Sequence, residues 1–353
     1  MLLTNTLTNQ PACAFRFQTV LLACLFLHTT TVNAQENPTA LQNLIEEIEQ
    51  HEKLYANLKL DVTSVNEMLP ERKEADQQIR HVTKTMLFRH GNQYREEESK
   101  RGRFQIQYFA PPKKELRMHS NTGVMKRMQV YDGDIFRSYS SIDLTTARKD
   151  GKPIKHHSGE ITDEPPQVSN LVRPHMFLFF DRGPYVPLST FLKGPAAIAA
   201  TPGAAYETRD RQIQVQILDE EKFAGFKCIR LSIKLVKDNG SLLTRHELWL
   251  AQGRNLIPVR KLSFPSHRSD TIPRSDSIVD TWQEIRPGVW FPHKAHQDEN
   301  NVFIIIKENR QQRYWHREYA TQDVELNPQL PEDIFTRLEF PPDTVMKSSY
   351  RGN

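Results

Sequence analysis

A series of β-strand patterns between residues 226 and 319 limits the fold of this chain more than any other feature of its sequence. In residues 226–237, apolar side chains such as Ile229 and Leu231 alternate with polar ones such as Arg230, and Asp238-Asn239-Gly240 then supplies a turn. The same alternation and turn chemistry predict further strands at residues 242–250, 256–264, 277–285 and 289–296. Strands that follow one another in this way form an antiparallel meander.

The first half of the chain repeats this pattern after one amphipathic helix. The helix is predicted from apolar residues at helical spacing, and the first strand from apolar residues at every second position: Leu41, Leu44, Ile45 and Ile48, then Leu58, Leu60 and Val62. Further strands are predicted at residues 79–88, 103–109, 115–120, 124–130 and 135–140, and again from residue 213. A meander this long has to curl, because strands twist and its apolar face needs cover. We therefore predict a mainly β (α+β) fold, a large curved antiparallel sheet or incomplete β-barrel with an N-terminal helix and short helices covering the concave face.

Residues 167–203 interrupt the strands with a different pattern. The segment is rich in Phe, Leu and Met, and Gly and Pro residues break it into short pieces. This composition predicts one or two short helices with irregular connections, inserted between the two halves of the sheet. The preceding residues, 150–166, are polar and turn-rich and predict an exposed loop. Because the sequence contains no repeat and no linker, we expect residues 35–353 to form a single domain that includes the insert.

The first 34 residues carry the features of an export signal. An apolar run at residues 19–27 follows Arg16 and precedes Val32-Asn33-Ala34, which fits signal-peptidase cleavage after Ala34. The run is shorter than the roughly 20 apolar residues that span a bilayer. We therefore expect a periplasmic or secreted protein. Two alternatives stay open: an uncut N-terminal anchor, and a lipoprotein acylated at Cys24, since Leu21-Leu22-Ala23-Cys24 resembles a lipobox. Membrane association is expected to be transient unless Cys24 is lipidated.

Charge and cysteine content narrow the possible partners and compartments. The formal net charge is +4, and the first 34 residues contain one basic residue and no acidic residue. A charge this close to balance does not favour a nucleic-acid partner. Of the three cysteines, Cys228 alone follows the expected cleavage site, so the mature chain cannot form an intramolecular disulfide. Cys228 is expected to pack in a strand as a small apolar residue.

No motif points to catalysis, to a metal or to a cofactor. The thirteen histidines include His156 and His157 in the expected loop, and His293 and His296, which would face opposite sides of a strand. A zinc site needs three or four ligands that converge on one ion, and these pairs do not supply them. The sequence contains neither a Gly-x-Ser-x-Gly elbow nor a phosphate loop. We therefore predict a protein that is not an enzyme and that uses no metal or cofactor.

Three groups of motifs follow one another across most of residues 38–346. The first is a strand–Pro–strand unit with an Asp-Gly hairpin, the second a Trp-containing strand with a Pro-containing return, and the third a C-terminal segment rich in Pro. They are Ala110-Pro111-Pro112 with Leu116-Arg117-Met118 and Tyr131-Asp132-Gly133-Asp134; Glu247-Leu248-Trp249-Leu250 with Asn255-Leu256-Ile257-Pro258 and Gly288-Val289-Trp290-Phe291-Pro292; and Val324-Glu325-Leu326-Asn327 with Phe340-Pro341-Pro342. In this order they resemble the superfamily of outer-membrane lipoprotein carriers, the LolA/LolB-like fold, in the form of a larger, uncharacterised exported relative.

The resemblance implies an incomplete antiparallel barrel whose mouth is closed by helices and whose apolar cavity holds acyl chains. It implies a periplasmic binding or carrier protein for an apolar ligand, such as a lipid or an acylated lipoprotein, with an envelope protein as a further partner. This chain departs from the carriers in its greater length and in having Ala110 where they have a lid-gating Arg. Arg117, on the next expected strand, is the candidate for that gating role.

The most apolar stretch after the signal, residues 176–180, is a candidate lid, since ligand sites are concave and mostly apolar. We assign six residues to the apolar cavity or its lid: Met176, Phe177, Phe179, Phe180, Trp249 and Trp290. Packing of the same side chains in the core is the alternative interpretation. A ring gains about 2–3 kcal/mol from burial in either case, so burial energy does not separate the two.

Two further segments, residues 302–306 and 311–319, have distinctive patterns, and the fold also allows an alternative function. Residues 302–306 predict a strand buried on both faces. Residues 311–319 alternate Arg with aromatic residues, which is typical either of a solvated barrel face or of a surface that binds sugars or nucleic acid. The alternative function is a protein-interaction or envelope-stress sensor module, in which the same fold has a filled interior and works through its rim.

Overall fold

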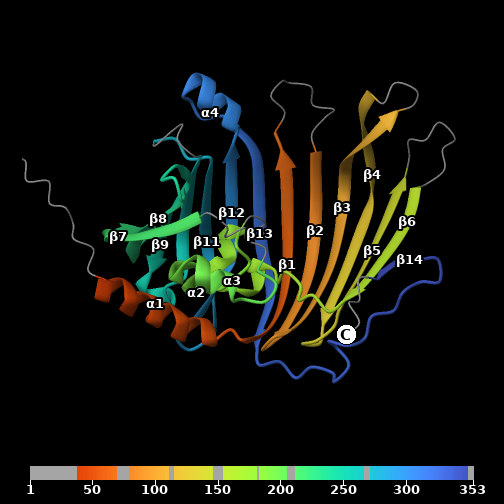
Figure 1. The fold of residues 1–353 in the computed structure, drawn as a ribbon, viewed down its shortest axis with the longest axis horizontal. Coiled ribbons are helices and arrows are strands. Elements are labelled where there is room, and N and C mark those ends of the chain that lie inside the picture. The colour runs from red at the N-terminus through yellow and green to blue at the C-terminus, as the bar shows by residue number, and fades with distance from the viewer. Residues whose placement is uncertain are drawn as a thin grey trace, which may run out of the picture. The chain divides into compact units, whose positions relative to one another are not determined.

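One sheet contains every strand in the described part of the chain, in the order β14-β6-β5-β4-β3-β2-β1-β13-β12-β11-β10-β9-β8-β7 (Figure 1). The computed structural model describes residues 38–69, 79–110, 115–145, 154–180, 183–204, 211–265 and 271–348. The expected signal peptide, Cys24 and the cleavage site after Ala34 lie outside these residues. Neighbouring strands are antiparallel in each pair except β14 with β6, which is parallel.

The first half of the sheet contains β1 (Asn57–Met68), β2 (Ile79–His90), β3 (Gln93–Ala110), β4 (Glu115–Tyr131), β5 (Phe136–Thr145) and β6 (Ile154–Thr162). The second half contains β7 (Arg211–Phe223), β8 (Phe226–Lys237), β9 (Leu242–Ala251), β10 (Pro258–Pro265), β11 (Ser275–Arg286), β12 (Val289–Asn300) and β13 (Arg313–Leu326), and the short β14 (Val345–Ser348) follows. The helices are α1 (Pro38–Lys53), η2 (Asn170–Val172), η3 (Pro174–Phe179), α2 (Leu188–Lys193), α3 (Pro195–Ala199), η4 (Gln252–Arg254) and α4 (Val302–Glu308).

The sheet is strongly curved and does not close, because β7 and β14 form two separate edges (Figure 1). Its two halves join where β1 pairs with β13, with Leu58 opposite Leu326. Helices α1, α2 and α3 lie over the second half of the sheet, and η3 contacts β10, β11 and β12. This arrangement confirms the predicted fold class, a mainly β incomplete barrel with an N-terminal helix and short helices on its concave side.

The local patterns explain why these segments adopt these structures. In β1, Leu58, Leu60 and Val62 are buried while the residues between them are partly exposed, as the period of two predicts. In α1, the apolar stripe that includes Leu44 and Ile48 is buried against the protein, as its helical spacing predicts. No helix among the described residues combines the length and the hydropathy of a membrane span.

Two apolar clusters form the core. The first lies beneath η3 and contains residues from both halves of the sheet. It includes Leu58, Leu60, Leu87, Phe177, Trp249, Phe291 and Tyr319. The second joins α1 and the insert helices to β8 and β9, and it includes Ile45, Ile48, Met176, Phe179, Phe191, Leu231, Ile233 and Leu250. The insert contributes to both clusters, so it is part of the folded core and holds the two halves of the sheet together.

The expectation of an exposed loop at residues 150–166 is wrong for residues 154–162, which form β6. The strand is polar because it lies next to the sheet edge, and hydrogen bonds across to β5 satisfy its side chains. Ser158 and Ser140 share a hydroxyl–hydroxyl bond of 2.7 Å, and the hydroxyl of Tyr139 lies 2.6 Å from Nδ1 of His157. His156 and His157 therefore lie in a strand and not in a loop.

The predicted strand at residues 302–306 is also wrong, because these residues belong to α4. Asn301 caps the helix by accepting a 3.0 Å hydrogen bond from the amide of Phe303, and Asn309 ends it in a left-handed conformation. Only one face is buried, since Ile305 is 1% exposed and Phe303 is 73% exposed. A short apolar run cannot by itself distinguish a strand from a helix, and here the two Asn caps decide for the helix.

The two strands expected at residues 115–120 and 124–130 form one strand, β4. The segment Asn121-Thr122-Gly123 resembles a turn in sequence, but Gly123 lies opposite Gly102 of β3 and continues the pairing. A side chain at Gly123 would overlap the backbone carbonyl of Asp143 on β5, so this glycine allows close approach of neighbouring strands.

Candidate functional site

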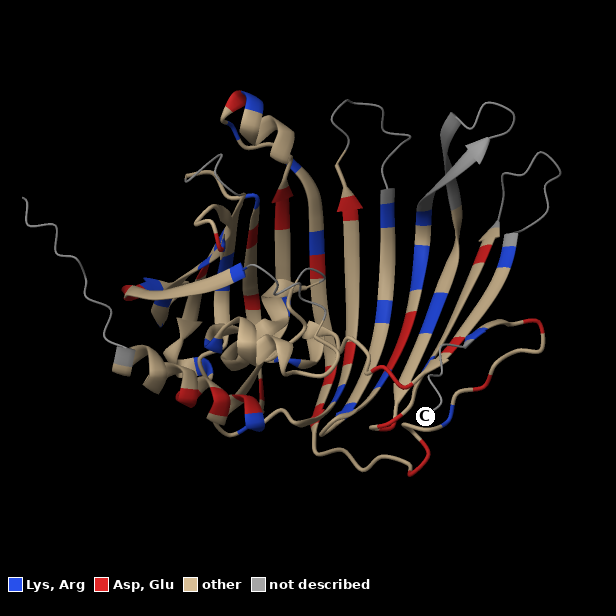
Figure 2. Cartoon of the chain, in the orientation of Figure 1, with Lys and Arg blue, Asp and Glu red and all other residues tan. Residues whose placement is uncertain are grey.

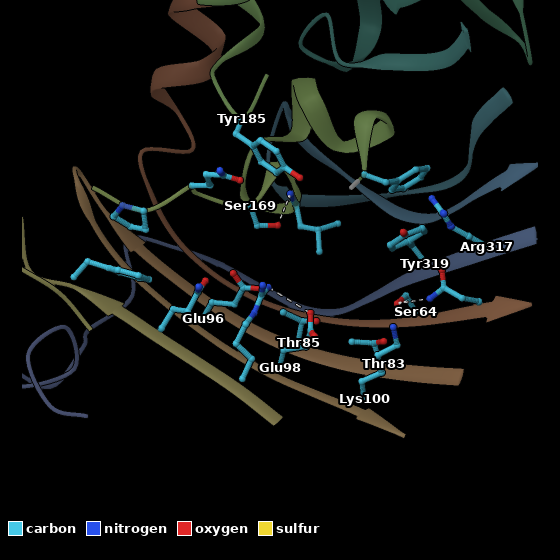
Figure 3. A pocket seen from close by; sticks show the side chains of 18 of the residues that line it. Ser64, Thr83, Thr85, Glu96, Glu98, Lys100, Ser169, Tyr185, Arg317 and Tyr319 are labelled. Carbon is cyan, nitrogen blue, oxygen red and sulfur yellow. Dashed lines mark hydrogen bonds and ion pairs between the residues drawn. The ribbon is translucent and has the colours of Figure 1, made fainter. Parts of the chain in front are cut away.

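The insert and α1 cover part of the concave side of the sheet, and the rest is open. They pack on the half formed by β7 to β12, where a cavity of about 540 Å³ remains beside Phe179, whereas β1 to β5 line an open groove of about 690 Å³ (Figure 3). The groove extends from Trp315 on β13 to Glu160 on β6, and residues 164–171 and Tyr185 border it from the insert side. Charges of both signs occur along the strands of this half (Figure 2).

The floor of the groove is built from alternate residues of four adjacent strands. These residues are polar and face the concave side: Ser64 and Asn66 on β1, His81, Thr83 and Thr85 on β2, Glu96, Glu98 and Lys100 on β3, and Arg127 and Gln129 on β4. On each strand the same face starts apolar near the insert and becomes polar farther along, as Leu60 followed by Ser64 and Leu87 followed by Thr85 show. The apolar core and the polar groove therefore lie next to each other on the same face of the sheet.

A hydrogen-bond network fixes the acidic part of this floor. The buried hydroxyl of Tyr94 donates to Oε2 of Glu96 at 2.6 Å, and Arg127 donates to Oε1 of the same carboxylate at 2.8 Å. Glu96 is 4% exposed, so both oxygens of a buried carboxylate are used within the protein. Beside it, burial raises the pKa of Glu98, although the charge of Arg127 opposes that rise. Burial raises the pKa of Tyr94 well above its usual value.

Aromatic side chains border the groove on the side of the insert and β13. The rings of Phe180 and Tyr319 stack with centroids 4.0 Å apart and an angle of 6° between their planes. Trp315 meets the ring of His81 edge to face at 6.5 Å. Burial, followed by the charges of Lys100 and Arg317, lowers the pKa of His81 to about 4. At neutral pH His81 therefore contributes an uncharged polar ring to the groove.

The six residues assigned to an apolar cavity or lid occupy different environments. Met176, Phe177, Phe179, Phe180 and Trp249 are all at most 4% exposed. Phe177 packs edge to face on Phe291 and Tyr319, which fills the curve of the sheet beneath η3. Of the six residues, Phe180 alone lines the groove, through the face it shares with Tyr319.

The two tryptophans assigned to the cavity lie away from the groove. The indole of Trp249 donates a 3.2 Å hydrogen bond to Glu221, and the ring of Trp290 lies 3.6 Å beneath the guanidinium carbon of Arg254. Arg117 lies on β4, opposite Tyr108 of β3 in the strand register. The structure thus brings the insert aromatics together with one another, and it does not bring Trp249 or Trp290 to the groove lining. The side chain of Arg117 lies outside the described part of the structure.

Sequence reasoning missed the polar floor of the groove. The available signal was the phase of the alternation, because Ser64 continues the inward face that Leu60 begins and Thr85 continues the face of Leu87. From the sequence alone, the alternation at residues 311–319 is typical either of a solvated barrel face or of a binding surface. Three of those residues, Trp315, Arg317 and Tyr319, line the groove. Among the described residues, no three His, Cys, Asp or Glu side chains are grouped so as to hold a metal ion.

No family model and no curated protein matches this sequence. The structure is similar to a DUF1329 family protein from Desulfovibrio piger, with 10% identity, coverage of 84% of this chain and 96% of that chain, and a TM-score of 0.38. It is also similar to a putative outer membrane lipoprotein-sorting protein domain from Vibrio parahaemolyticus (10% identity, 83% and 95% coverage, TM-score 0.37). A porin-like protein from Bacteroides uniformis shows 7% identity, 75% and 97% coverage and a TM-score of 0.24. At these TM-scores the similarities do not establish membership of any of these groups.

Proposed function

We propose that this chain is an exported binding or carrier protein that holds an amphiphilic ligand, such as a lipid, in the open half of its concave face. The polar part of the ligand lies on the floor formed by β1 to β4, and the apolar part lies against the aromatic border near Phe180 and Tyr319. The observation that carries this proposal is the division of one groove into a polar floor and an aromatic border. We also propose that the groove binds its ligand without chemical conversion.

The size and the chemistry of the groove support a bound ligand. Small-molecule sites are typically clefts of about 300–1,000 Å³, and about 690 Å³ lies within that range. Ser64, Thr83 and Thr85 offer hydroxyl groups that both donate and accept hydrogen bonds, which suits a neutral or zwitterionic head group. An acyl chain alone would offer no hydrogen-bond partner to Thr83 and Thr85, and leaving a buried polar group without a partner costs about 1–3 kcal/mol. An amphiphile is therefore favoured over a purely apolar ligand.

Native mass spectrometry of the mature protein, purified from its own envelope, tests this function. We expect a bound mass of lipid size on the wild-type protein and a clear loss of that mass on Trp315→Ala, which removes a ring from the groove border. Trp290→Ala is the matched control, because Trp290 lies under Arg254 and outside the groove lining. An apo mass for the wild type under mild conditions would count against the proposal.

A protein-interaction or sensor module is the second candidate function. The observation in its favour is the packed part of the concave face, where Phe177, Phe291 and Tyr319 occupy the space beneath η3. This candidate predicts the apo mass in the same experiment. It also predicts that an envelope protein is recovered on the folded chain after cross-linking in the intact envelope.

A further inference from the structure

A second cavity, of about 230 Å³, lies where the end of α1, the end of β2 and the insert meet. None of its lining residues belongs to the groove lining. Its polar lining comes from all three elements: Glu52 in the last turn of α1, Arg89 on β2, and Arg173, His175 and Ser189 on the insert. The cavity is thus a separate polar site within the joint between the insert and the sheet.

Two arginines of this cavity lack a carboxylate partner in the part of the chain that the structure describes. Arg173 is 9% exposed, and one of its terminal nitrogens donates a 2.7 Å hydrogen bond to the carbonyl of Val168. Its Nε is buried and has no hydrogen-bond partner among the residues described. Arg89 is half-buried, and its Nε donates to the carbonyl of Gly91 at 3.3 Å. Neither arginine forms an ion pair with a carboxylate among the described residues.

The nearest carboxylate, Glu52, already has other partners. It accepts hydrogen bonds from the amides of Leu188 and Ser189, at 2.6 and 3.4 Å, and from the hydroxyl of Ser189. Glu52 therefore binds the first turn of α2, and its charge reaches the arginines only at longer range. Burial, together with the charge of Arg89, lowers the pKa of Arg173 to about 9. These groups leave an excess of positive charge beside the cavity.

The other ionisable groups of the lining do not remove this excess. Glu49 pairs with Lys193 at 2.5 Å, and Lys53 adds a further exposed positive charge. Nε2 of His175 lies 2.7 Å from the carbonyl oxygen of Asn255. Burial lowers the pKa of His175 to about 4, so its ring is uncharged at neutral pH. A buried cation without a partner is costly, and the guanidinium fork matches the two oxygens of a carboxylate or a phosphate.

We propose that this cavity binds a small oxyanion, a carboxylate or phosphate group, between the guanidinium groups of Arg89 and Arg173. The anion then supplies the negative charge that the two arginines lack, and it connects β2 to the insert. The unused Nε of Arg173 and the committed oxygens of Glu52 carry this assignment. It does not depend on the proposed groove ligand, since the two cavities share no lining residue.

Thermal unfolding and isothermal titration of the full mature protein test the proposal, with sodium phosphate and sodium acetate as probes and sodium chloride at equal ionic strength as reference. We expect a saturable rise in unfolding temperature and a measurable dissociation constant for at least one probe. Arg173→Met and Arg89→Met should each weaken that binding at least tenfold. Arg260→Met is the matched control, because Arg260 already holds Asp276 through two hydrogen bonds of 3.1 and 2.7 Å, and it should bind the probe as the wild type does.

Arg89→Met decides the test if Arg173→Met does not fold, because Arg89 is half-buried near a strand end. A third titration, with sodium octanoate, separates a free ion from the anionic group of a larger ligand. If octanoate binds more tightly than acetate, and Arg89→Met loses this binding, the result supports the proposed site and indicates that the bound anionic group belongs to a larger ligand. Equal binding of the two would support the site with a free ion. No saturable effect of any probe beyond that of chloride, or unchanged binding in Arg89→Met, would overturn the proposal.

Discussion

The hydroxyl of Tyr94 donates a 2.6 Å hydrogen bond to the carboxylate of Glu96, two residues along the same strand. The amide of Ser169, in the insert, donates to the same hydroxyl at 3.3 Å. One phenol thus joins the floor of the groove to the segment that borders it. Tyr94 is fully buried and Glu96 is 4% exposed. This buried contact therefore fixes the position of the groove floor relative to the insert.

Replacement of this tyrosine should destabilise the protein more than loss of an ordinary hydrogen bond. Tyr94→Phe leaves one oxygen of Glu96 without its donor and the amide of Ser169 without its acceptor, so we expect a loss of about 1–3 kcal/mol. Urea unfolding measures this change. Tyr139→Phe is the control, because the partner of its hydroxyl, His157, is partly exposed, and we expect a loss below about 1 kcal/mol. Equal losses in the two variants would argue against a special role for the Tyr94 contact.

Because the side chains beneath η3 are closely packed, truncating one of them should lower the free energy of unfolding substantially. Phe177 is fully buried and packs on Phe180, Phe291 and Tyr319, so Phe177→Ala should lower the free energy of unfolding by about 3–5 kcal/mol. Phe303→Ala removes a ring of the same size that is 73% exposed, and it should change stability by less than about 0.5 kcal/mol. Guanidinium unfolding of both variants measures the difference. A small effect of Phe177→Ala would mean that the insert does not pack on the sheet.

Two buried histidines predict that stability falls in mild acid. Burial lowers the pKa of His175 to about 4 and that of His246 to about 3, from an ordinary value of 6.5. Between these values the unfolded chain binds protons that the folded chain does not, so unfolding becomes easier as the pH falls below 6.5. Each histidine contributes up to about 1.4 kcal/mol per pH unit in this window.

Urea unfolding of the wild type at pH 7 and pH 5 measures this loss. The variant His246→Gln should lose less stability between the two pH values than the wild type, because it lacks one of the histidines whose pKa is lowered by burial. An exposed histidine gives the control, and His156→Gln should match the wild-type slope. An equal loss of stability in His246→Gln and in the wild type would contradict the burial of the His246 ring.

A substitution in the floor of the groove should weaken ligand binding and leave the protein folded. Thr85→Leu fills part of the groove with an apolar side chain, and it should weaken binding of an amphiphile at least tenfold. The fold should tolerate it, because the change places an apolar residue beside Leu87 on the same face. Thr63→Leu is the matched control on the other face of β1, outside the groove lining. Fluorescence titration with a lysophospholipid measures both variants, and equal affinities would exclude Thr85 from the site.

The architecture could be predicted from the sequence because it depends on local periodicity. The alternation that includes Leu58, Leu60 and Val62 identifies β1 and the face it buries, and the spacing in α1 identifies the helix in the same way. Local signals failed where they were short or ambiguous. Residues 302–306 are uniformly apolar, and only the Asn residues on either side show that they form α4.

The position of the site could not be predicted in the same way, because it depends on where the insert lies. Ser64 and Thr85 share the inward face of Leu60 and Leu87, so periodicity alone assigns all four to the interior. Which of them are covered depends on how far η3 extends along the sheet, and that is a tertiary property. Phe177 was assigned to a ligand cavity on composition, and the structure shows its ring packed between Phe291 and Tyr319.

The most direct test of the proposed function is hydrogen–deuterium exchange of the mature protein with and without a lysophospholipid. We predict that the lipid slows exchange in β1 to β4 and in the border of residues 164–171, with little change in β8 to β10. Slower exchange only in β8 to β10, or no change in any strand at saturating lipid, would contradict the groove as the binding site.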